Sequence, residues 1–157
     1  ELLPSWIIHW LRDIYLKYAK KFDNNEKIYI DRTESKFNHC QIQNDNEIFN
    51  FLKEKGFSKY KVGELSFFEQ IYLFNNAKII IGAHGAAFTN LAFCKPDTNI
   101  IEIKPVLHPN NQYKRISQIN NLNYNLIQTK ELDENQKKLG DIYLPIKKLK
   151  HCIKSFD

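Results

Sequence analysis

The spacing of apolar residues predicts strands and helices that alternate along most of the chain. Short runs rich in isoleucine predict buried strands, and apolar residues at three- and four-residue intervals predict amphipathic helices. We expect strands at 27–31, 60–62, 78–81, 99–103 and 124–128. We expect helices at 3–21, 45–55, 66–76, 86–93, 110–119 and 145–156. This alternation is typical of a mainly parallel sheet with helices on both faces, so we predict one Rossmann-like α/β domain over residues 1–157.

Capping residues stand at several of the predicted helix boundaries. Pro4 and Pro145 each fit the first turn of a helix. Gly56 directly follows the helix at 45–55, where a C-cap glycine is expected. Ser66 and Glu69 have the three-residue spacing of a capping box. These residues support the helix positions that the apolar spacing predicts.

One face of the first predicted helix carries large apolar residues at four-residue steps. These residues are Trp6, Trp10, Ile14 and Tyr18. The segment 2–16 is largely apolar, but Arg12 and Asp13 interrupt it, and no apolar run approaches the roughly 20 residues of a membrane span. We interpret the segment as an amphipathic helix and not as a signal peptide, and we expect any membrane anchor upstream of it.

The composition is that of a packed globular domain, with 43% hydrophobic residues. The formal net charge is +5, and the basic residues are spread along the chain apart from Lys147, Lys148 and Lys150. Nucleic-acid binders usually concentrate basic residues beside stacking aromatics, so RNA binding would depend on this one cluster. A modest positive charge suits an anionic ligand such as a nucleoside diphosphate. Because the sequence contains no Met, we expect it to be an excerpt of a longer chain.

The sequence shows no typical metal site. Cys40, Cys94 and Cys152 are far apart and lack zinc-ligand spacing, so we expect free thiols of the kind found in reducing compartments. The Asp-x-Asp pair that holds a divalent cation in many nucleotide-sugar enzymes is missing. Asp45 and Glu47 would point in different directions on a helix, and the carboxylates at 131 and 133 lie in a polar loop. We therefore expect no metal and no other cofactor.

The loop at 82–86, with the sequence Gly-Ala-His-Gly-Ala, is the strongest candidate for a binding site. It joins a buried strand to a short helix, where ligands bind in doubly wound sheets. We expect Gly82 and Gly85 to adopt backbone angles that other residues avoid, and the helix that starts near Ala86 to present amides to a phosphate. His84 would donate to a phosphate oxygen or act as an acid or base at the rim. Alternatively, His84 only ties two loops together.

Three further side chains are candidates at the same edge of the sheet. Arg32 follows the first strand and could hold a diphosphate in a forked geometry, or form an ion pair with Asp31 or with the glutamate at 34. Glu102, in the strand after the loop, could accept both hydroxyls of a ribose, or be an exposed edge residue. Gln70 lies beside the apolar stripe of its helix and could face the ligand or cap a backbone group.

Six segments together resemble one family of enzymes. They are 28–32, 44–47, 65–70, 77–90, 91–94 and 100–103, in family-like order and spacing. They resemble the catalytic domain of glycosyltransferase family 61, which includes plant xylosyl- and arabinosyltransferases and animal N-acetylglucosaminyltransferases. The positions that match the family's motifs are Arg32, Gln70, His84, Gly85, Asn90 and Glu102. One departure is that Lys36 is the only clear cation in a stretch where relatives carry a second basic residue.

The resemblance implies the nucleotide-sugar-binding lobe of a GT-B glycosyltransferase. Such an enzyme transfers a sugar, commonly from a UDP-sugar, with inversion and without metal. The acceptor is expected to be a glycan or a glycoprotein, bound mainly by an upstream lobe of the same protein. We expect the secretory-pathway lumen if the source is eukaryotic, and the cytoplasm or a membrane periphery if it is bacterial. The alternative is a catalytically inactive nucleotide-binding or scaffolding module of the same fold.

Overall fold

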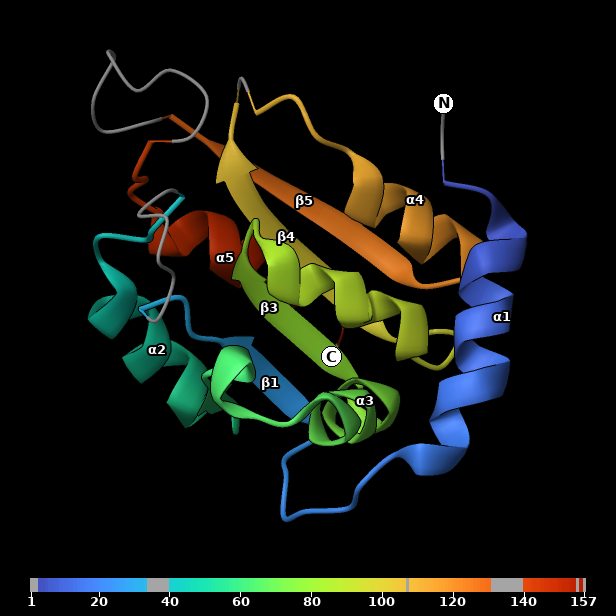
Figure 1. Ribbon diagram of the computed structural model, residues 1–157. Coiled ribbons are helices and arrows are strands. Elements are labelled where there is room, and N and C mark those ends of the chain that lie inside the picture. The colour runs from blue at the N-terminus through green and yellow to red at the C-terminus, as the bar shows by residue number, and fades with distance from the viewer. Residues whose placement is uncertain (1–2, 34–39, 107, 131–139, 155, 157) are drawn as a thin grey trace.

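The computed structural model describes residues 3–33, 40–106, 108–130, 140–154 and 156, and it contains a five-stranded sheet whose strand pairs are all parallel. From one edge to the other, the strands are β2 (Ser58–Tyr60), β1 (Lys27–Ile30), β3 (Ile79–Ala83), β4 (Asn99–Pro105) and β5 (Asn123–Thr129). Figure 1 shows the longer strands crossing the molecule side by side. The predicted α/β fold with a parallel sheet is confirmed.

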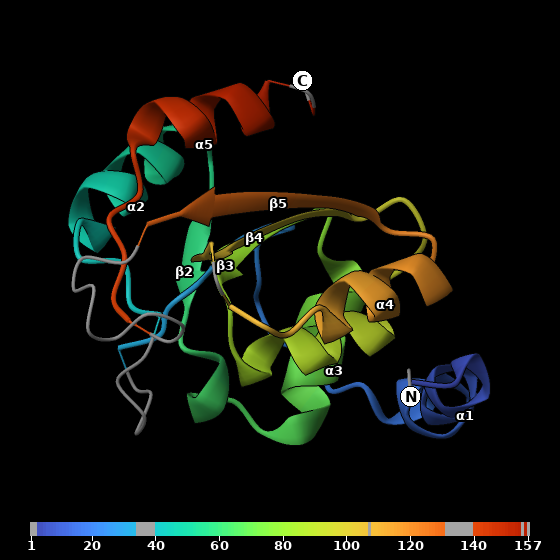
Figure 2. The ribbon, with the colours of Figure 1, turned by 90° about the horizontal axis from the view of Figure 1, so that it is seen from above.

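Helices cover both faces of the sheet, as Figure 2 shows from above. The helices on one face are α2 (Asp45–Glu54) and α5 (Ile146–Ile153). The helices on the other face are α3 (Phe67–Asn76), the 3-10 helix η3 (Ala86–Phe93) and α4 (Gln112–Ile119), with α1 (Ser5–Tyr15) alongside them. Successive strand residues point to opposite faces, so Ile80 packs in the core under α3 and η3, and Ile81 packs in the core under α2 and α5.

Several element boundaries differ from the prediction. Helix α1 ends at Tyr15 and continues only as a 3-10 turn, η1 (Leu16–Tyr18), short of the predicted end at residue 21. The short helix predicted at 86–93 forms, but it is 3-10 helical and so more tightly wound than an α-helix. The strand predicted at 60–62 lies two residues earlier, because Val62 begins another 3-10 turn, η2 (Val62–Glu64).

The caps that the sequence predicts are present. Gly56 has a φ of +82°, the left-handed conformation that glycine adopts without strain after a helix. In the capping box, the Glu69 amide donates to Ser66 Oγ at 3.4 Å, and the Ser66 amide donates to Glu69 Oε2 at 3.0 Å. Pro4 and Pro145 stand one position earlier than predicted, as the N-cap residues of α1 and α5.

Helix α1 places its tryptophans at the surface. The side chains of Trp6 and Trp10 are 65% and 51% exposed, and it is Ile8 that the helix buries in the core. The helix is anchored by Arg12, which donates to the carbonyls of Ala92 at 2.9 Å and Cys94 at 2.6 Å. Ala92 lies in the last turn of η3, and Cys94 is its C-cap. Helix α1 therefore contacts η3 at the end opposite to the predicted binding loop. None of the described helices is long and apolar enough to cross a membrane.

The strand order creates one position where the chain changes direction across the sheet. After β1 the chain moves outward to β2, and it then returns to the other side of β1 to form β3. The carboxyl ends of the two strands that flank such a switch point form the crevice where doubly wound sheets bind ligands. Because Ile30 of β1 pairs with Gly82 of β3, Arg32 and His84 follow these strands at the same level.

Candidate active site

Arg32 and Gly85 are in direct contact across the switch point. The Arg32 guanidinium donates through Nη1 to the backbone carbonyl of His84. A Cβ atom added to Gly85 would lie 1.2 Å from Arg32 Nη1 and 2.4 Å from Arg32 Cζ. Residue 85 is therefore a glycine because a guanidinium occupies the space that any side chain would need. The sequence prediction that Arg32 and the His84 loop meet at one edge of the sheet is confirmed.

The unusual backbone angles predicted for the two loop glycines are wrong. Gly85 has a φ of 169°, which is extended backbone, and among the described residues Gly56 is the glycine in the left-handed region. A Cβ on Gly82 would lie 2.9 Å from Ile30 Cβ and 3.2 Å from Phe88 Cε2. Both loop glycines thus serve close packing, Gly82 between β1 and η3, and Gly85 beneath Arg32.

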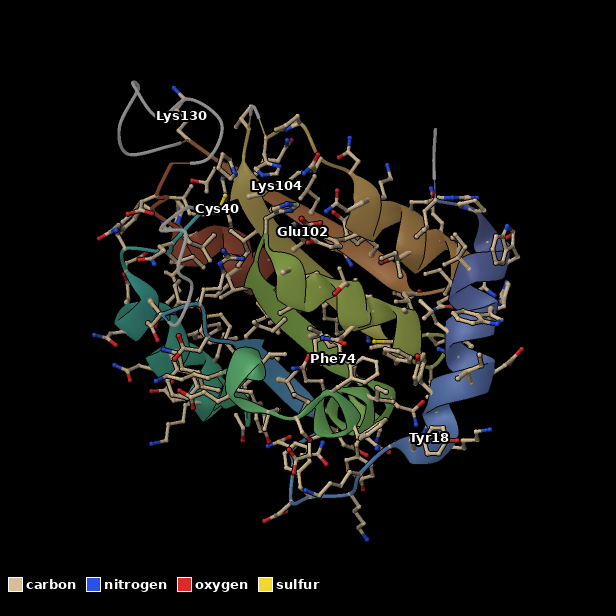
Figure 3. The ribbon with its side chains drawn as sticks, in the orientation of Figure 1. Tyr18, Cys40, Phe74, Glu102, Lys104 and Lys130 are labelled. Carbon is tan, nitrogen blue, oxygen red and sulfur yellow. The ribbon has the colours of Figure 1, made fainter. Side chains whose placement is uncertain are left out.

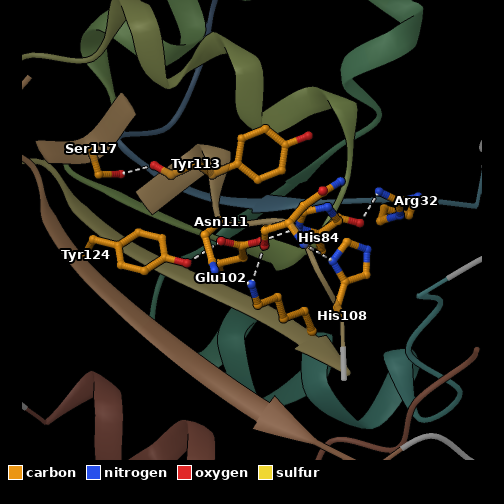
Figure 4. Close-up of polar contacts among 10 residues, drawn as sticks. Arg32, His84, Glu102, His108, Asn111, Tyr113, Ser117 and Tyr124 are labelled. Carbon is orange, nitrogen blue, oxygen red and sulfur yellow. Dashed lines mark hydrogen bonds and ion pairs between the residues drawn. The ribbon is translucent and has the colours of Figure 1, made fainter. Parts of the chain in front are cut away.

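His84 is buried beneath the rim, with 4% of its surface exposed. Its Nδ1 is hydrogen-bonded to Glu102 Oε1, and its backbone amide donates to the Ile103 carbonyl at 2.7 Å. Figure 4 shows the His84 ring directed toward Glu102, with Arg32 on its other side. The side chain therefore does tie its own loop to β4. The same bond also orients the ring, which a functional histidine requires.

Glu102 is 1% exposed, so the alternative that it is an exposed edge residue is wrong. In Figure 3 it lies with Lys104 toward the carboxyl end of β4. Its second oxygen, Oε2, accepts a hydrogen bond from the hydroxyl of Tyr124 on β5. Burial and the charge of Glu102 raise the pKa of Tyr124 well above its ordinary value, so the hydroxyl keeps its proton and remains a donor. Both carboxylate oxygens therefore have a protein donor.

The Glu102 contact fixes the proton arrangement that we assign to His84. An ionised carboxylate only accepts hydrogen bonds, so the partner atom Nδ1 must carry a proton. The second ring nitrogen, Nε2, then accepts a proton when the ring is neutral and donates one when the ring is charged. This is the arrangement by which a carboxylate prepares an imidazole for acid–base work or for binding an anion.

Two more aromatic rings contact His84, and sequence reasoning missed both. The rings of His108 and Tyr113 lie with their centroids 3.9 Å and 4.9 Å from that of His84. His108 comes from the connection between β4 and α4, and it is 7% exposed. Burial, and next the charge of Glu102, raise the pKa of Tyr113, so this hydroxyl is also uncharged near neutral pH.

Lys104 is a further residue of the cluster that the sequence analysis did not select. It is 1% exposed, and its Nζ donates to the Asn110 carbonyl and, at 2.9 Å, to Asn111 Oδ1. A buried ammonium is costly unless hydrogen bonds compensate it, so this one fixes the loop that precedes α4. A signal was present: Lys104 lies two residues after Glu102, and strand residues two apart share a face.

The model of the protein family described as Glycosyltransferase 61 matches residues 2–101 of the chain. The chain belongs to glycosyltransferase family 61. The match includes Arg32, the His84 loop and Asn90, and it ends one residue before Glu102. The resemblance stated from the sequence motifs is thus confirmed.

Two known glycosyltransferases are similar in sequence to this family 61 chain. It is 28% identical to a beta-1,2-xylosyltransferase from Oryza sativa subsp. japonica over 113 residues, which are 71% of the chain and 19% of that protein. It is 41% identical to an EGF domain-specific O-linked N-acetylglucosamine transferase from Gallus gallus over 66 residues, which are 39% of the chain and 12% of that protein. The matched parts thus span less than a fifth of either relative.

Gln70 and Asn90 connect α3 to η3 beside the family 61 loop. Gln70 Nε2 donates to the Leu65 carbonyl at 3.0 Å, and its Oε1 accepts from Asn90 Nδ2 at 2.9 Å. Of the two predicted roles for Gln70, capping a backbone group is the one observed. Ala86, at the start of η3, is exposed, and its carbonyl accepts from Thr89 Oγ1 at 2.7 Å. Ala86 and Thr89 therefore form the solvent-facing rim above the buried His84.

The other candidates take places away from this cluster. Asp31 pairs with Lys59 at 3.6 Å and accepts from the Thr33 amide at 2.8 Å. These contacts outweigh the opposing effect of burial and lower the pKa of Asp31. Lys59 and the Thr33 amide therefore compensate the charge of Asp31. Among the described residues, no group of three or more His, Cys, Asp or Glu side chains could hold a metal. The glutamate at 34, Lys36 and the carboxylates at 131 and 133 lie outside the described residues.

The C-terminal lysines and the cysteines have contacts of their own. Lys148 donates to the Gln128 carbonyl at 2.7 Å, and Lys150 lies over the Phe51 ring, 5.2 Å from its centroid. Two of the three lysines on which RNA binding would depend are thus engaged within the protein. Cys40, Cys94 and Cys152 form no disulfide bond with one another.

Proposed function

We propose that this family 61 chain is the donor-binding lobe of a GT-B enzyme that transfers a sugar from a UDP-sugar to a glycan or glycoprotein, with inversion and without metal. The observation that carries the proposal is the juxtaposition of Arg32 and His84 at the switch point of the sheet. Arg32 is a permanent cation with a forked set of donors, and His84 is an imidazole that Glu102 orients. Together they suit the two phosphates of a departing nucleoside diphosphate.

The proposed reaction forms one bond and breaks one. The acceptor hydroxyl oxygen attacks the anomeric carbon in line, while the bond from that carbon to the diphosphate oxygen breaks. The hydroxyl proton passes to a base, which we place in the acceptor-binding lobe upstream and leave unassigned. The negative charge that develops on the leaving diphosphate is stabilised by Arg32 and by His84, both fixed before the reaction begins.

In this proposal Glu102 does not mainly bind the ribose, which is the role expected from its position in the strand. Both of its oxygens already accept hydrogen bonds, one from His84 and one from Tyr124. We propose that Glu102 is a positioning residue for His84 and that contact with a ribose is secondary. The amides at the start of η3 and the exposed Ala86 would form the outer wall of the diphosphate site.

A nucleotide screen tests whether the chain binds the proposed donor. UDP and UDP-sugars at 100-fold over their dissociation constant should raise the free energy of unfolding of the intact protein by about 2.7 kcal/mol, detected as a higher thermal midpoint. Transfer must then be measured separately with the same sugars. Stabilisation by UDP without transfer in the intact protein favours the inactive-module alternative. Stabilisation by no nucleoside diphosphate would contradict the transferase function and leave only a scaffolding module that binds no nucleotide.

A chelator tests the metal-independent part of the proposal. Because Arg32 and His84 supply the positive charge, we expect turnover in excess EDTA to stay within about twofold of the untreated rate. Turnover of the same preparation after addition of Mg²⁺ or Mn²⁺ provides the comparison. A loss of turnover in EDTA that Mn²⁺ restores would show that a cation shares the leaving-group charge, as in the Asp-x-Asp enzymes.

The same relatives support a proposal for the compartment. The two named proteins come from a plant and a bird, both eukaryotes. We therefore propose the lumen of the secretory pathway as the site of action in preference to the bacterial alternative.

A further inference from the structure

His84 and His108 form a closely stacked pair of imidazoles beside the switch point. Their centroids are 3.9 Å apart, their planes are inclined by 47°, and they are 4% and 7% exposed. Figure 4 shows the two rings side by side, with Arg32 at the same end of the cluster and Tyr124 at the opposite end. Two imidazolium ions at this separation would repel each other strongly in so buried a place, so we expect one charge on the pair at most.

The surroundings of His108 hold it in the neutral form. The Asn110 amide donates to His108 Nδ1 at 3.3 Å, so Nδ1 is an acceptor and the ring proton belongs on Nε2. If Nδ1 were protonated, its N–H group would face the N–H group of Asn110, and two donors would be in contact without an acceptor. The Asn110 backbone has little freedom to turn away, because its carbonyl accepts a hydrogen bond from the buried Lys104 ammonium.

The hydrogen bond from His84 to Glu102 has the opposite effect. Its Nδ1 already carries a proton toward Glu102, so adding a second proton at Nε2 keeps that hydrogen bond and strengthens it with charge. Among the described residues, the other titratable groups of this cluster are the cations Arg32 and Lys104 and the hydroxyls of Tyr113 and Tyr124. Glu102 is thus the one anion among these groups, and a bound diphosphate would add more negative charge to favour the imidazolium.

We propose that His108 is a further ligand-binding residue, a neutral donor through Nε2, and that His84 is the ring of the pair that takes up a proton when a nucleoside diphosphate binds. The proposal rests on the proposed function, because it assigns the charge and donor at the same site. Proton uptake by His84 would make the affinity for UDP depend on pH. Affinity falls as pH rises, by up to about tenfold per pH unit, because one proton is taken up with the ligand.

Calorimetry of UDP binding to the intact protein, in buffers that differ in ionisation enthalpy, measures the proton uptake directly. We expect net uptake by the unaltered protein and none by His84→Gln. His108→Phe keeps an aromatic ring but loses the donor, so uptake should persist while affinity falls by about tenfold or more. His108→Gln, whose amide places a donor near the Nε2 position, should regain part of that affinity. Thermal midpoints establish that each variant is folded.

A matched control is available on the other face of the sheet. His151 is an exposed histidine of α5, so His151→Gln should change neither affinity nor proton uptake. UDP binding without proton uptake, or uptake lost in His108→Phe and kept in His84→Gln, would overturn the inference and leave the proposed function standing. An absence of UDP binding by the unaltered protein would remove the proposed function as well.

Discussion

Arg32→Ala and His84→Ala are each expected to lower the turnover of the intact protein by at least about 10²-fold, the scale on which enzymes lose rate with one preorganised donor. The reason is that, in the proposed reaction, both groups stabilise the charge that develops on the leaving diphosphate at the switch point. Steady-state transfer with a UDP-sugar measures the effect. Arg32→Lys should recover only part of the loss, because an ammonium keeps the charge and lacks the planar fork.

Controls for these variants come from the same chain. Arg115 lies on α4 and donates to the Leu3 carbonyl at 3.4 Å, and His9 is exposed on α1. Arg115→Ala and His9→Ala should keep turnover within about twofold of the unaltered protein. Near-normal transfer by both Arg32→Ala and His84→Ala would remove these two residues from the mechanism.

Gly85→Ala is expected to lower turnover by about 10²-fold, although it adds a single methyl group. The added Cβ would occupy the position of Arg32 Nη1, 1.2 Å away, so the guanidinium must move off the His84 carbonyl. Since the displaced group is the end of a flexible side chain, the free energy of unfolding should change by less than about 1 kcal/mol. Turnover and the thermal midpoint, measured on one preparation, separate the two effects.

Gly56→Ala should show the reverse pattern. Gly56 has a φ of +82° with no atom within 4 Å of an added Cβ, so alanine costs about 1 kcal/mol of backbone strain and leaves turnover unchanged. In the double variant Arg32→Ala/Gly85→Ala, the second change should add little, because both remove the same contact. An additive loss would mean that Gly85 has a role apart from Arg32.

Much of the fold could be predicted because local signals and the global architecture agree. The isoleucine runs of β1, β3 and β4 are buried on both faces of the sheet and therefore read as continuous apolar segments. The prediction was less accurate where side chains do not decide the backbone. The end of α1 and the 3-10 geometry of η3 depend on contacts such as those of Arg12, which come from residues about 80 positions away.

The site could be predicted in part. Arg32 and His84 each follow a strand with a strong apolar pattern, so their common edge follows from the α/β topology. The burial of Glu102 did not follow, because it depends on contacts with Tyr124 of the next strand and with the His84 ring. The predicted angles of Gly85 were wrong for a related reason: the glycine is required by a guanidinium more than 50 residues earlier, and no local pattern records that contact.

The placement of the tryptophans decides how this protein can be followed in solution. Both tryptophans of the chain, Trp6 and Trp10, are on the solvent side of α1, so their fluorescence should already resemble that of indole in water in the native state. Emission will therefore respond little to unfolding or to a nucleotide bound near His84, and binding assays need a labelled ligand or calorimetry. A blue shift would instead report that another surface has covered α1.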